Sequence, residues 1–124
     1  MKLITKEWIK KAEEDYRVAI RECKARPMSC SAVCFHSQQC IEKYMKAILQ
    51  ENEISFARVH DLEILLRMVK EFIPLLENDR EDFIWLTTFS VEVRYPGFDV
   101  EKDDAKKAVA SMKKIRKILK SYFG

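Results

Sequence analysis

The sequence has little glycine and proline: only 2 glycines and 3 prolines occur among its 124 residues. Because these residue types mark most turns, the chain should consist of long elements joined by short connections, with breaks at Pro27, Pro74 and Pro96. The low glycine count also excludes a glycine-rich phosphate loop. A phosphate group would therefore have to meet side chains and helix N-termini instead.

Long apolar runs are missing as well. No segment approaches the ~20 consecutive apolar residues that a membrane-crossing helix needs. The amino-terminal residues MKLITKEWIKK contain no apolar core of the kind found in a signal peptide. We therefore expect no membrane contact and a cytoplasmic location.

Motifs for metal binding and nucleophilic catalysis are also absent. The sequence has no CxxC pair, no HExxH motif and only 2 histidines, which leaves a cysteine nucleophile short of bases. Cys30 and Cys34 share one face of a predicted helix, whereas His36 and Cys40 point in nearly the opposite direction at ~100° per residue. One metal ion cannot gather all four, so we predict no metal site and no cofactor. The cysteines, which include Cys23, are expected to be free thiols.

The composition is that of a small helical protein. Hydrophobic residues make up 48% of the chain and charged residues 35%, with a formal net charge of +3 that does not demand a nucleic-acid partner. This length supports one core, so we expect a single domain over residues 1–124. Apolar residues recur with a period near ~3.6, and no segment alternates as a half-buried strand would, which predicts an all-α fold.

The first two helices are predicted from their end signals. The first should start near Thr5, a usable N-cap, and end before Pro27. Its apolar face consists of Trp8, Ala12, Tyr16, Ala19 and Cys23. The second should run from Ser29 or Ser31 to Asn52.

Three further helices complete the prediction of about five. Asp61 can cap a third helix that ends around Pro74, and a fourth covers roughly Asp79 to Arg94. The last helix has the cleanest apolar spacing, at Ala108, Met112, Ile115, Leu119 and Tyr122. Antiparallel packing through short loops predicts an up-and-down helical bundle.

The predicted fourth helix is apolar around much of its circumference. Its large apolar residues cannot share one face, and a helix of this kind is buried on more than one side. A bundle this small cannot cover every side of it. We therefore expect a homodimer through the fourth helix, in which a second copy covers Trp85 or Phe89.

Polar residues form a separate stripe on the predicted second helix. At ~100° per residue, His36, Gln39, Lys43 and Lys46 lie along one side and could present donors to a phosphate and a base. The alternative is a solvated polar face, which spacing alone favours. Gln38 is more unusual, because it falls on the apolar stripe and its amide needs partners from a neighbouring helix, a subunit or a ligand.

Positive charge is concentrated at two further places. Pro96 forces Tyr95 out of the helical region, so the guanidinium of Arg94 should lie beside a turn. There it either stabilises the last carbonyls of the helix or offers a planar cation suited to phosphate. Beyond Ala105 the last helix carries lysines and an arginine but no acid. The helix dipole explains cations near a C-terminus, which favours a solvated surface over an RNA site.

Several short segments occur in an order that resembles one known family. They are AEEDYRVA (12–19), FHSQQCIEKYMKA (35–47), the start His60-Asp61-Leu62, Leu86-Thr87 with the following helix, and Arg94-Tyr95-Pro96. Together they resemble the higher eukaryotes and prokaryotes nucleotide-binding domain, the HEPN family, over nearly the whole chain. The resemblance implies an all-α bundle that dimerises, a nucleotide-binding role, and pairing with a small nucleotidyltransferase in toxin–antitoxin modules.

Many members of that family are metal-independent ribonucleases in which a histidine follows an arginine after four to six residues. Counting from Arg94, those places hold Asp99, Val100 and Glu101, and none is histidine. Because that histidine would act as acid or base, we predict no catalytic residues. Two alternatives stay open. One is an RNA-cleaving toxin whose acid or base is Asp99 or Glu101, and the other is a non-catalytic protein-interaction module.

The resemblance also implies that the polar residues of the second helix do more than face water. We expect the phosphate of a nucleotide to meet one lysine and one arginine through charge-assisted hydrogen bonds. The expected ligand-binding residues are Arg94, Lys43, Tyr95, His36 and Gln39. A structural alternative needs no ligand, because Gln38 can bond between helices and Glu42 can pair with Lys46.

Overall fold

The computed structural model describes residues 1–90, 93 and 95–124. These residues form five α-helices and one 3₁₀ helix and contain no β-strand, so the predicted all-α class is confirmed. None of these helices is long and apolar enough to span a bilayer. In chain order the elements are α1 (Leu3–Cys23), α2 (Cys30–Glu51), α3 (Leu62–Val69), η1 (Pro74–Asp79), α4 (Arg80–Thr87) and α5 (Lys102–Ser121).

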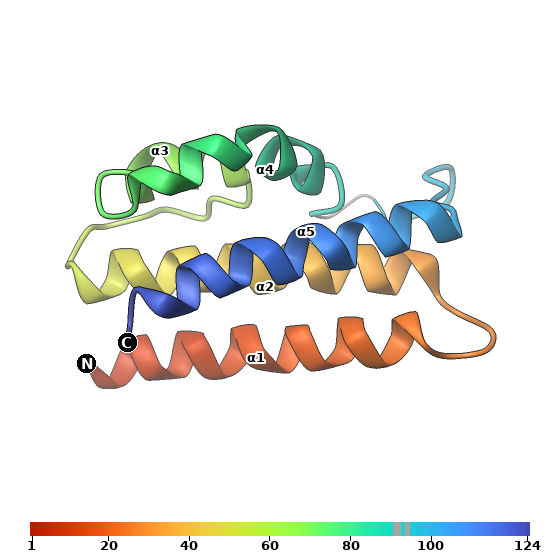
Figure 1. Ribbon diagram of the computed structural model, residues 1–124, viewed down its shortest axis with the longest axis horizontal. Helices are drawn as coiled ribbons and strands as arrows, with labels where there is room; N and C mark the ends of the chain where they lie inside the picture. The colour runs from red at the N-terminus through yellow and green to blue at the C-terminus, as the bar shows by residue number, and fades with distance from the viewer. Residues whose placement is uncertain (91–92, 94) are drawn as a thin grey trace.

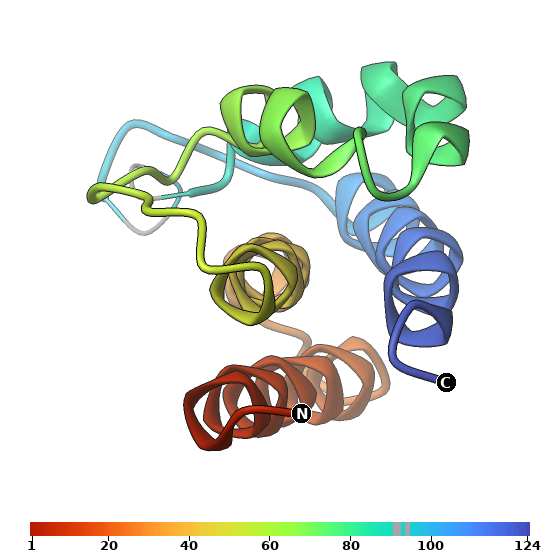
Figure 2. The same ribbon diagram turned by 90° about the vertical axis from the view of Figure 1, so that its left-hand side faces the viewer.

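The three long helices α1, α2 and α5 pack against one another (Figure 1). α1 and α2 run antiparallel, η1 and α4 lead the chain back along the bundle, and α5 then runs parallel to α2. Seen end-on, α2 lies between α1 and the shorter layer of α3, η1 and α4, with α5 at one side (Figure 2). This up-and-down course makes α2 the central helix of the bundle.

The central position of α2 determines what it buries. Four of its large apolar residues, Ile41, Tyr44, Met45 and Ile48, are fully buried. Each side chain of this size contributes about 1.5–3 kcal/mol when it leaves water. Because neighbours cover α2 on several sides, polar residues that a surface helix would leave in water are buried with the apolar ones.

Two of the predicted helix starts are confirmed. Ser29 precedes α2, and its hydroxyl accepts a hydrogen bond from the backbone N–H of Ala32 at 3.4 Å. Asp61 precedes α3, and its carboxylate accepts the N–H of Glu63 at 2.8 Å and that of Ile64 at 3.4 Å. These side chains satisfy donors that the first turn of a helix cannot pair internally.

The predicted start of the first helix is wrong by about one turn. α1 begins at Leu3 after the N-cap Lys2, and Thr5 lies inside the helix, fully buried. The hydroxyl of Thr5 donates to the carboxylate of Glu51 at 2.8 Å, and the backbone N–H of Lys2 donates to the same carboxylate at 3.0 Å. A residue from the end of α2 therefore takes the place of a local cap.

The predicted fourth helix is also wrong in extent. Its start is confirmed, because Asp79 is the N-cap of α4, but α4 ends at Thr87. Beyond it, the N–H groups of Thr88, Phe89 and Ser90 bond carbonyls three residues back. The hydroxyl of Thr87 accepts the N–H of Leu62 at 2.8 Å and donates to the carbonyl of Phe83 at 3.0 Å. Such side-chain bonds compete with the helix ladder. The predicted end at Arg94 lies outside the described residues.

The aromatic residues of this segment pack against other side chains of the same chain. Of the two residues expected to meet a second copy, Phe89 is only 3% exposed and is covered within the chain, whereas Trp85 is half-buried. The ring of Phe89 lies 4.8 Å from that of Trp85 and 6.3 Å from that of Phe98, centroid to centroid. The ammonium of Lys107 lies 4.2 Å from the centroid of the Trp85 ring. Ile84, 44% exposed, is the large apolar residue of α4 that stays open.

Candidate functional site

Three of the predicted ligand-binding residues lie along α2, and a carboxylate from α1 joins two of them. The Nδ1 atom of His36 lies 2.7 Å from one oxygen of Asp15, and the ammonium of Lys43 donates to the other oxygen at 2.6 Å. The seven-residue spacing places both side chains on the same side of α2. Asp15 is 7% exposed, so this bridge is a partly buried contact between helices.

The bonds to Asp15 leave one ring nitrogen of His36 and two N–H donors of Lys43 available for a ligand. An ionised carboxylate only accepts hydrogen bonds, so Nδ1 of His36 carries the proton toward Asp15 and Nε2 is the nitrogen left for a ligand. Lys43 uses one of its three N–H donors on Asp15. The side chains of His36 and Lys43 are 28% and 24% exposed, which keeps these atoms within reach of solvent.

A second cluster lies around Glu42, along the same stretch of α2 but on a neighbouring face of the helix. The carboxylate of Glu42 accepts hydrogen bonds from the amide of Gln38 at 3.0 Å and from the ammonium of Lys46 at 3.0 Å. Nδ1 of His60 lies 3.1 Å from the same carboxylate. Glu42 and Lys46 are 3% and 5% exposed. The ammonium of Lys46 also lies over the rings of Trp8 and Phe56, at 5.7 and 5.6 Å from their centroids, in cation–π contact.

The amide of Gln38 finds its partners within the chain. Its NH₂ group also donates to the backbone carbonyl of His60 at 3.2 Å, and its oxygen accepts from the amide of Gln39 at 2.7 Å. The bond to the carbonyl of His60 and the contact between His60 and Glu42 attach the segment before α3 to α2. The predicted pairing of Glu42 with Lys46 is confirmed, whereas Gln38 bonds residues of its own helix and the segment before α3 rather than a second helix. Among the described residues, Gln39 keeps one N–H and its oxygen for other partners.

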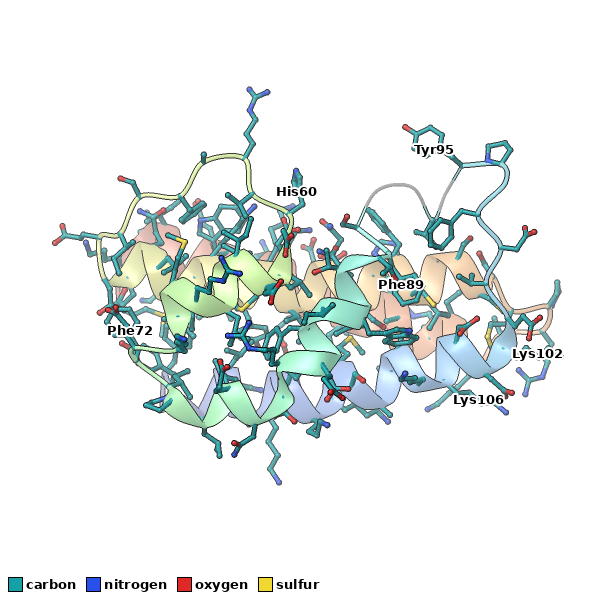
Figure 3. The ribbon with its side chains drawn as sticks, turned by 90° about the horizontal axis from the view of Figure 1, so that it is seen from above. His60, Phe72, Phe89, Tyr95, Lys102 and Lys106 are labelled. Carbon is teal, nitrogen blue, oxygen red and sulfur yellow. The ribbon has the colours of Figure 1, made fainter. Side chains whose placement is uncertain are left out.

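Tyr95 lies on a different part of the fold. It is 62% exposed and lines a surface hollow of about 530 Å³ together with Pro96, Phe98 and Asp99. His60 and Tyr95 lie on two loops that project on the same side of the bundle (Figure 3). Within the described part of the chain, no hydrogen bond joins Tyr95 to the residues of α2. Arg94 lies outside the described residues.

Asp15 is the functional candidate that the sequence-based list omits. It lies between Ala12 and Ala19, both fully buried, on the stripe that α1 turns toward the core. A carboxylate on an apolar stripe needs partners, just as the amide of Gln38 does. This interruption of the stripe is the signal that could have identified it.

A third carboxylate, Glu13, joins α1 to α5. It accepts two hydrogen bonds from the guanidinium of Arg116, at 2.7 and 2.6 Å, and one from the hydroxyl of Tyr44 at 2.6 Å. The bonds from Arg116 lower the pKa of Glu13 below its ordinary value of 4.5. The guanidinium also lies 3.8 Å from the centroid of the Tyr16 ring. Arg116 is thus occupied by this contact.

The cysteines show no arrangement for catalysis or metal binding within the described residues. All four are free thiols, as expected. Burial raises the pKa of Cys34 to about 12 and that of Cys40 further, which keeps both protonated near neutral pH. The described residues contain no group of three or more histidine, cysteine or acidic side chains placed to bind a metal ion.

Comparison with known proteins identifies the family. Residues 5–122 match the HEPN domain. The chain belongs to the HEPN domain family. The family expected from the short motifs is thereby confirmed over nearly the whole chain. This HEPN domain is 27% identical, over 131 residues, to a protein of Methanocaldococcus jannaschii named "Putative toxin MJ1304". That alignment covers 93% of this chain and 85% of the relative. No solved structure matches the chain.

The structure also describes the places where ribonuclease members carry the histidine. In this HEPN domain Asp99 is exposed and Val100 is partly buried. Glu101 is the N-cap of α5, where its carboxylate accepts the backbone N–H of Asp104 in a capping box. Glu101 therefore has a local structural role at the start of α5.

Proposed function

We propose that this HEPN domain binds a nucleotide and acts in a cytoplasmic toxin–antitoxin module as the partner of a small nucleotidyltransferase. The family match over residues 5–122 carries the proposal. The relative named as a toxin supports the same kind of module. The polar cluster on α2 supplies free donors for a ligand, which supports the nucleotide-binding part.

The proposed ligand site combines Lys43 and Arg94 for phosphate with His36, Gln39 and Tyr95 as neighbours. Lys43 keeps two donors beyond its bond to Asp15, and Nε2 of His36 can donate when the ring is protonated. The carboxylate of Asp15 compensates the charge of Lys43. Arg94 must therefore supply most of the net positive charge, and we expect micromolar to millimolar affinity, about −8 to −4 kcal/mol.

A calorimetric titration of the purified protein with ATP and GTP tests nucleotide binding. We expect saturable heat for the unaltered chain, a larger loss in Arg94→Ala than in Lys43→Ala, and no loss in Lys11→Ala. Lys11 is a matched control because it lies on the surface of α1 and pairs only weakly with Glu14 at 3.6 Å. Circular dichroism confirms that each variant is folded. An absence of heat up to millimolar nucleotide would contradict direct binding.

Growth measurements test the module. Production of the chain in a bacterial host should slow growth, and co-production of a nucleotidyltransferase encoded beside its gene should restore it. The RNA-cleaving alternative predicts in addition that pure protein cleaves a short RNA and that Asp99→Asn abolishes the cleavage. Intact RNA at high protein concentration removes that alternative. Growth that no nucleotidyltransferase restores would contradict the proposed partner.

We also propose that the chain forms a homodimer through α4. Ile84 is 44% exposed, and Ile64 and Leu75 on the neighbouring elements are 43% and 57% exposed. Exposed apolar residues of this size are typical of surfaces that another chain covers. Light scattering at micromolar concentration should report a dimer for the unaltered chain and a monomer for Ile84→Glu. A monomeric unaltered chain would exclude the dimer.

A further inference from the structure

A small pocket lies at the end of the bundle, between the α1–α2 turn and the start of α5. Arg26, Pro27 and Met28 line it from the turn, and Lys102 and Lys106 line it from α5. Its volume is about 250 Å³, and it is more enclosed than the hollow beside Tyr95. Figure 3 places both lysines at the N-terminal end of α5, away from the loop that carries His60.

The charged residues that line this pocket are all positive. Three of its five lining residues are cations and none is an acid. Among residues 1–90, 93 and 95–124, neither lysine has an ion-pair partner, and the guanidinium of Arg26 donates only to the backbone carbonyl of Ala25, at 2.9 Å. Lys102 and Lys106 are four residues apart on α5 and repel one another. An anion between the three cations would relieve this repulsion.

Three of the acids near these cations in sequence are bonded to backbone groups, and Asp103, which follows Lys102, does not line the pocket. The carboxylate of Glu22 accepts the N–H of Ser29 at 2.9 Å. Asp104 accepts the N–H of Glu101 at 2.9 Å, and Glu101 accepts the N–H of Asp104 in return. Because these carboxylates cap the turn and the helix, they stay away from the cations. The capping also means that side chains, and not the helix N-terminus, would hold an anion here.

The size and chemistry of the pocket select the ligand class. Sites for drug-sized ligands occupy roughly 300–1,000 Å³, so this smaller pocket suits one or two phosphate groups better than a whole nucleotide. The planar guanidinium of Arg26 can bind two phosphate oxygens, and each lysine adds a point charge. Pro27 and Met28 add an apolar side to the pocket.

We propose that Arg26, Lys102 and Lys106 bind a phosphate or pyrophosphate group, either free or at the end of a larger molecule. The bound group would bridge the α1–α2 turn and α5. This site shares no residue with the nucleotide site proposed above and does not depend on it.

Titration with inorganic pyrophosphate at fixed ionic strength tests the pocket. We expect saturable binding to the unaltered chain and at least a tenfold loss in the double variant Lys102→Gln/Lys106→Gln. The double variant Lys113→Gln/Lys117→Gln is the matched control, because it removes two exposed lysines from the same helix and changes the net charge equally. Binding should survive in this control and in Lys43→Ala, which separates the pocket from the nucleotide site.

ATP distinguishes a free anion from a phosphate carried by a larger molecule. Competition of ATP with pyrophosphate that persists in the Lys43→Ala variant assigns the pocket to the phosphate end of a nucleoside-sized ligand. An absence of competition assigns it to the free anion. Equal weakening in the two lysine double variants, or no saturable heat with pyrophosphate, would overturn the proposal.

Discussion

Two carboxylates in this HEPN domain each hold a histidine and a lysine, but at different depths. Asp15 bonds His36 and Lys43 at 2.7 and 2.6 Å, and Glu42 bonds His60 and Lys46 at 3.1 and 3.0 Å. The side chain of Lys43 is 24% exposed, whereas that of Lys46 is 6% exposed.

The difference in burial gives the two clusters different roles. Around Glu42, the amide of Gln38 and two aromatic rings complete the contacts of the buried Glu42–Lys46 pair, whereas the side chain of His60 is 51% exposed. Breaking such a buried pair leaves a charge with no solvation. Around Asp15, water reaches the cations and can solvate whatever a mutation leaves behind. The Glu42 cluster therefore holds the fold together, and the Asp15 cluster has atoms to spare for a ligand.

The largest expected effect comes from breaking the buried cluster. Glu42→Ala leaves the ammonium of Lys46 buried and unpaired, so the free energy of unfolding should fall by about 3–5 kcal/mol. Urea denaturation measures it. The double variant Glu42→Leu/Lys46→Met should recover part of the loss, because both charges are then removed. A loss below about 1 kcal/mol would show that water reaches Lys46 and would abolish the contrast with Asp15.

Replacing Glu13 should have an intermediate effect on stability, and this effect should depend on pH. Hydrogen bonds from Arg116 lower its pKa in the folded chain, so the stability it supplies is present above its ordinary value of 4.5 and is lost as pH falls through the folded value. Near pH 6, Glu13→Gln should be less stable by about 1.5–3 kcal/mol. This gap should narrow in denaturation curves recorded toward pH 3. Glu14→Gln is the control, and a gap independent of pH would contradict the assignment.

The smallest expected effect concerns the Asp15 cluster. Asp15→Asn keeps a hydrogen-bond acceptor but removes the charge that compensates Lys43. If the proposed site is correct, ATP should bind on the order of tenfold more tightly, which corresponds to about 1.4 kcal/mol. The calorimetric titration described above measures it. Glu42→Gln should leave the affinity unchanged in folded protein. Unchanged affinity in Asp15→Asn would mean that Lys43 does not contact the ligand.

Local signals were sufficient for most of the fold. Ser29 and Asp61 cap the helices that they were expected to cap, and the apolar spacing of α5 matches the residues that it buries, Ala108, Met112, Ile115 and Leu119. These features depend on residues a few positions apart, so periodicity and cap chemistry predict them. The start of α1 was missed because Glu51, far away in the sequence, accepts the bonds that a local cap would have accepted.

Only the part of the candidate site that lies on α2 was predictable from the sequence. The seven-residue spacing places His36 and Lys43 together on α2, but their common partner comes from α1, and no pattern within α2 names it. The burial of Phe89 was likewise not predictable from the pattern of its own segment. Its burial results from Phe98 and Trp85, and the apolar pattern of its own segment indicated a second copy of the chain instead.

The sequence by itself determined the helical class, the main breaks, the family and the polar stripe on α2, because each depends on residue types at short spacing. Only the tertiary structure decided which of those polar residues stay accessible. Lys43 and Lys46 lie three positions apart on one helix, and the packing of α1 with the segment before α3 buries the second and leaves the first near water. Burial is a property of neighbours from elsewhere in the chain, and it sets the free-energy cost of leaving a charge unpaired.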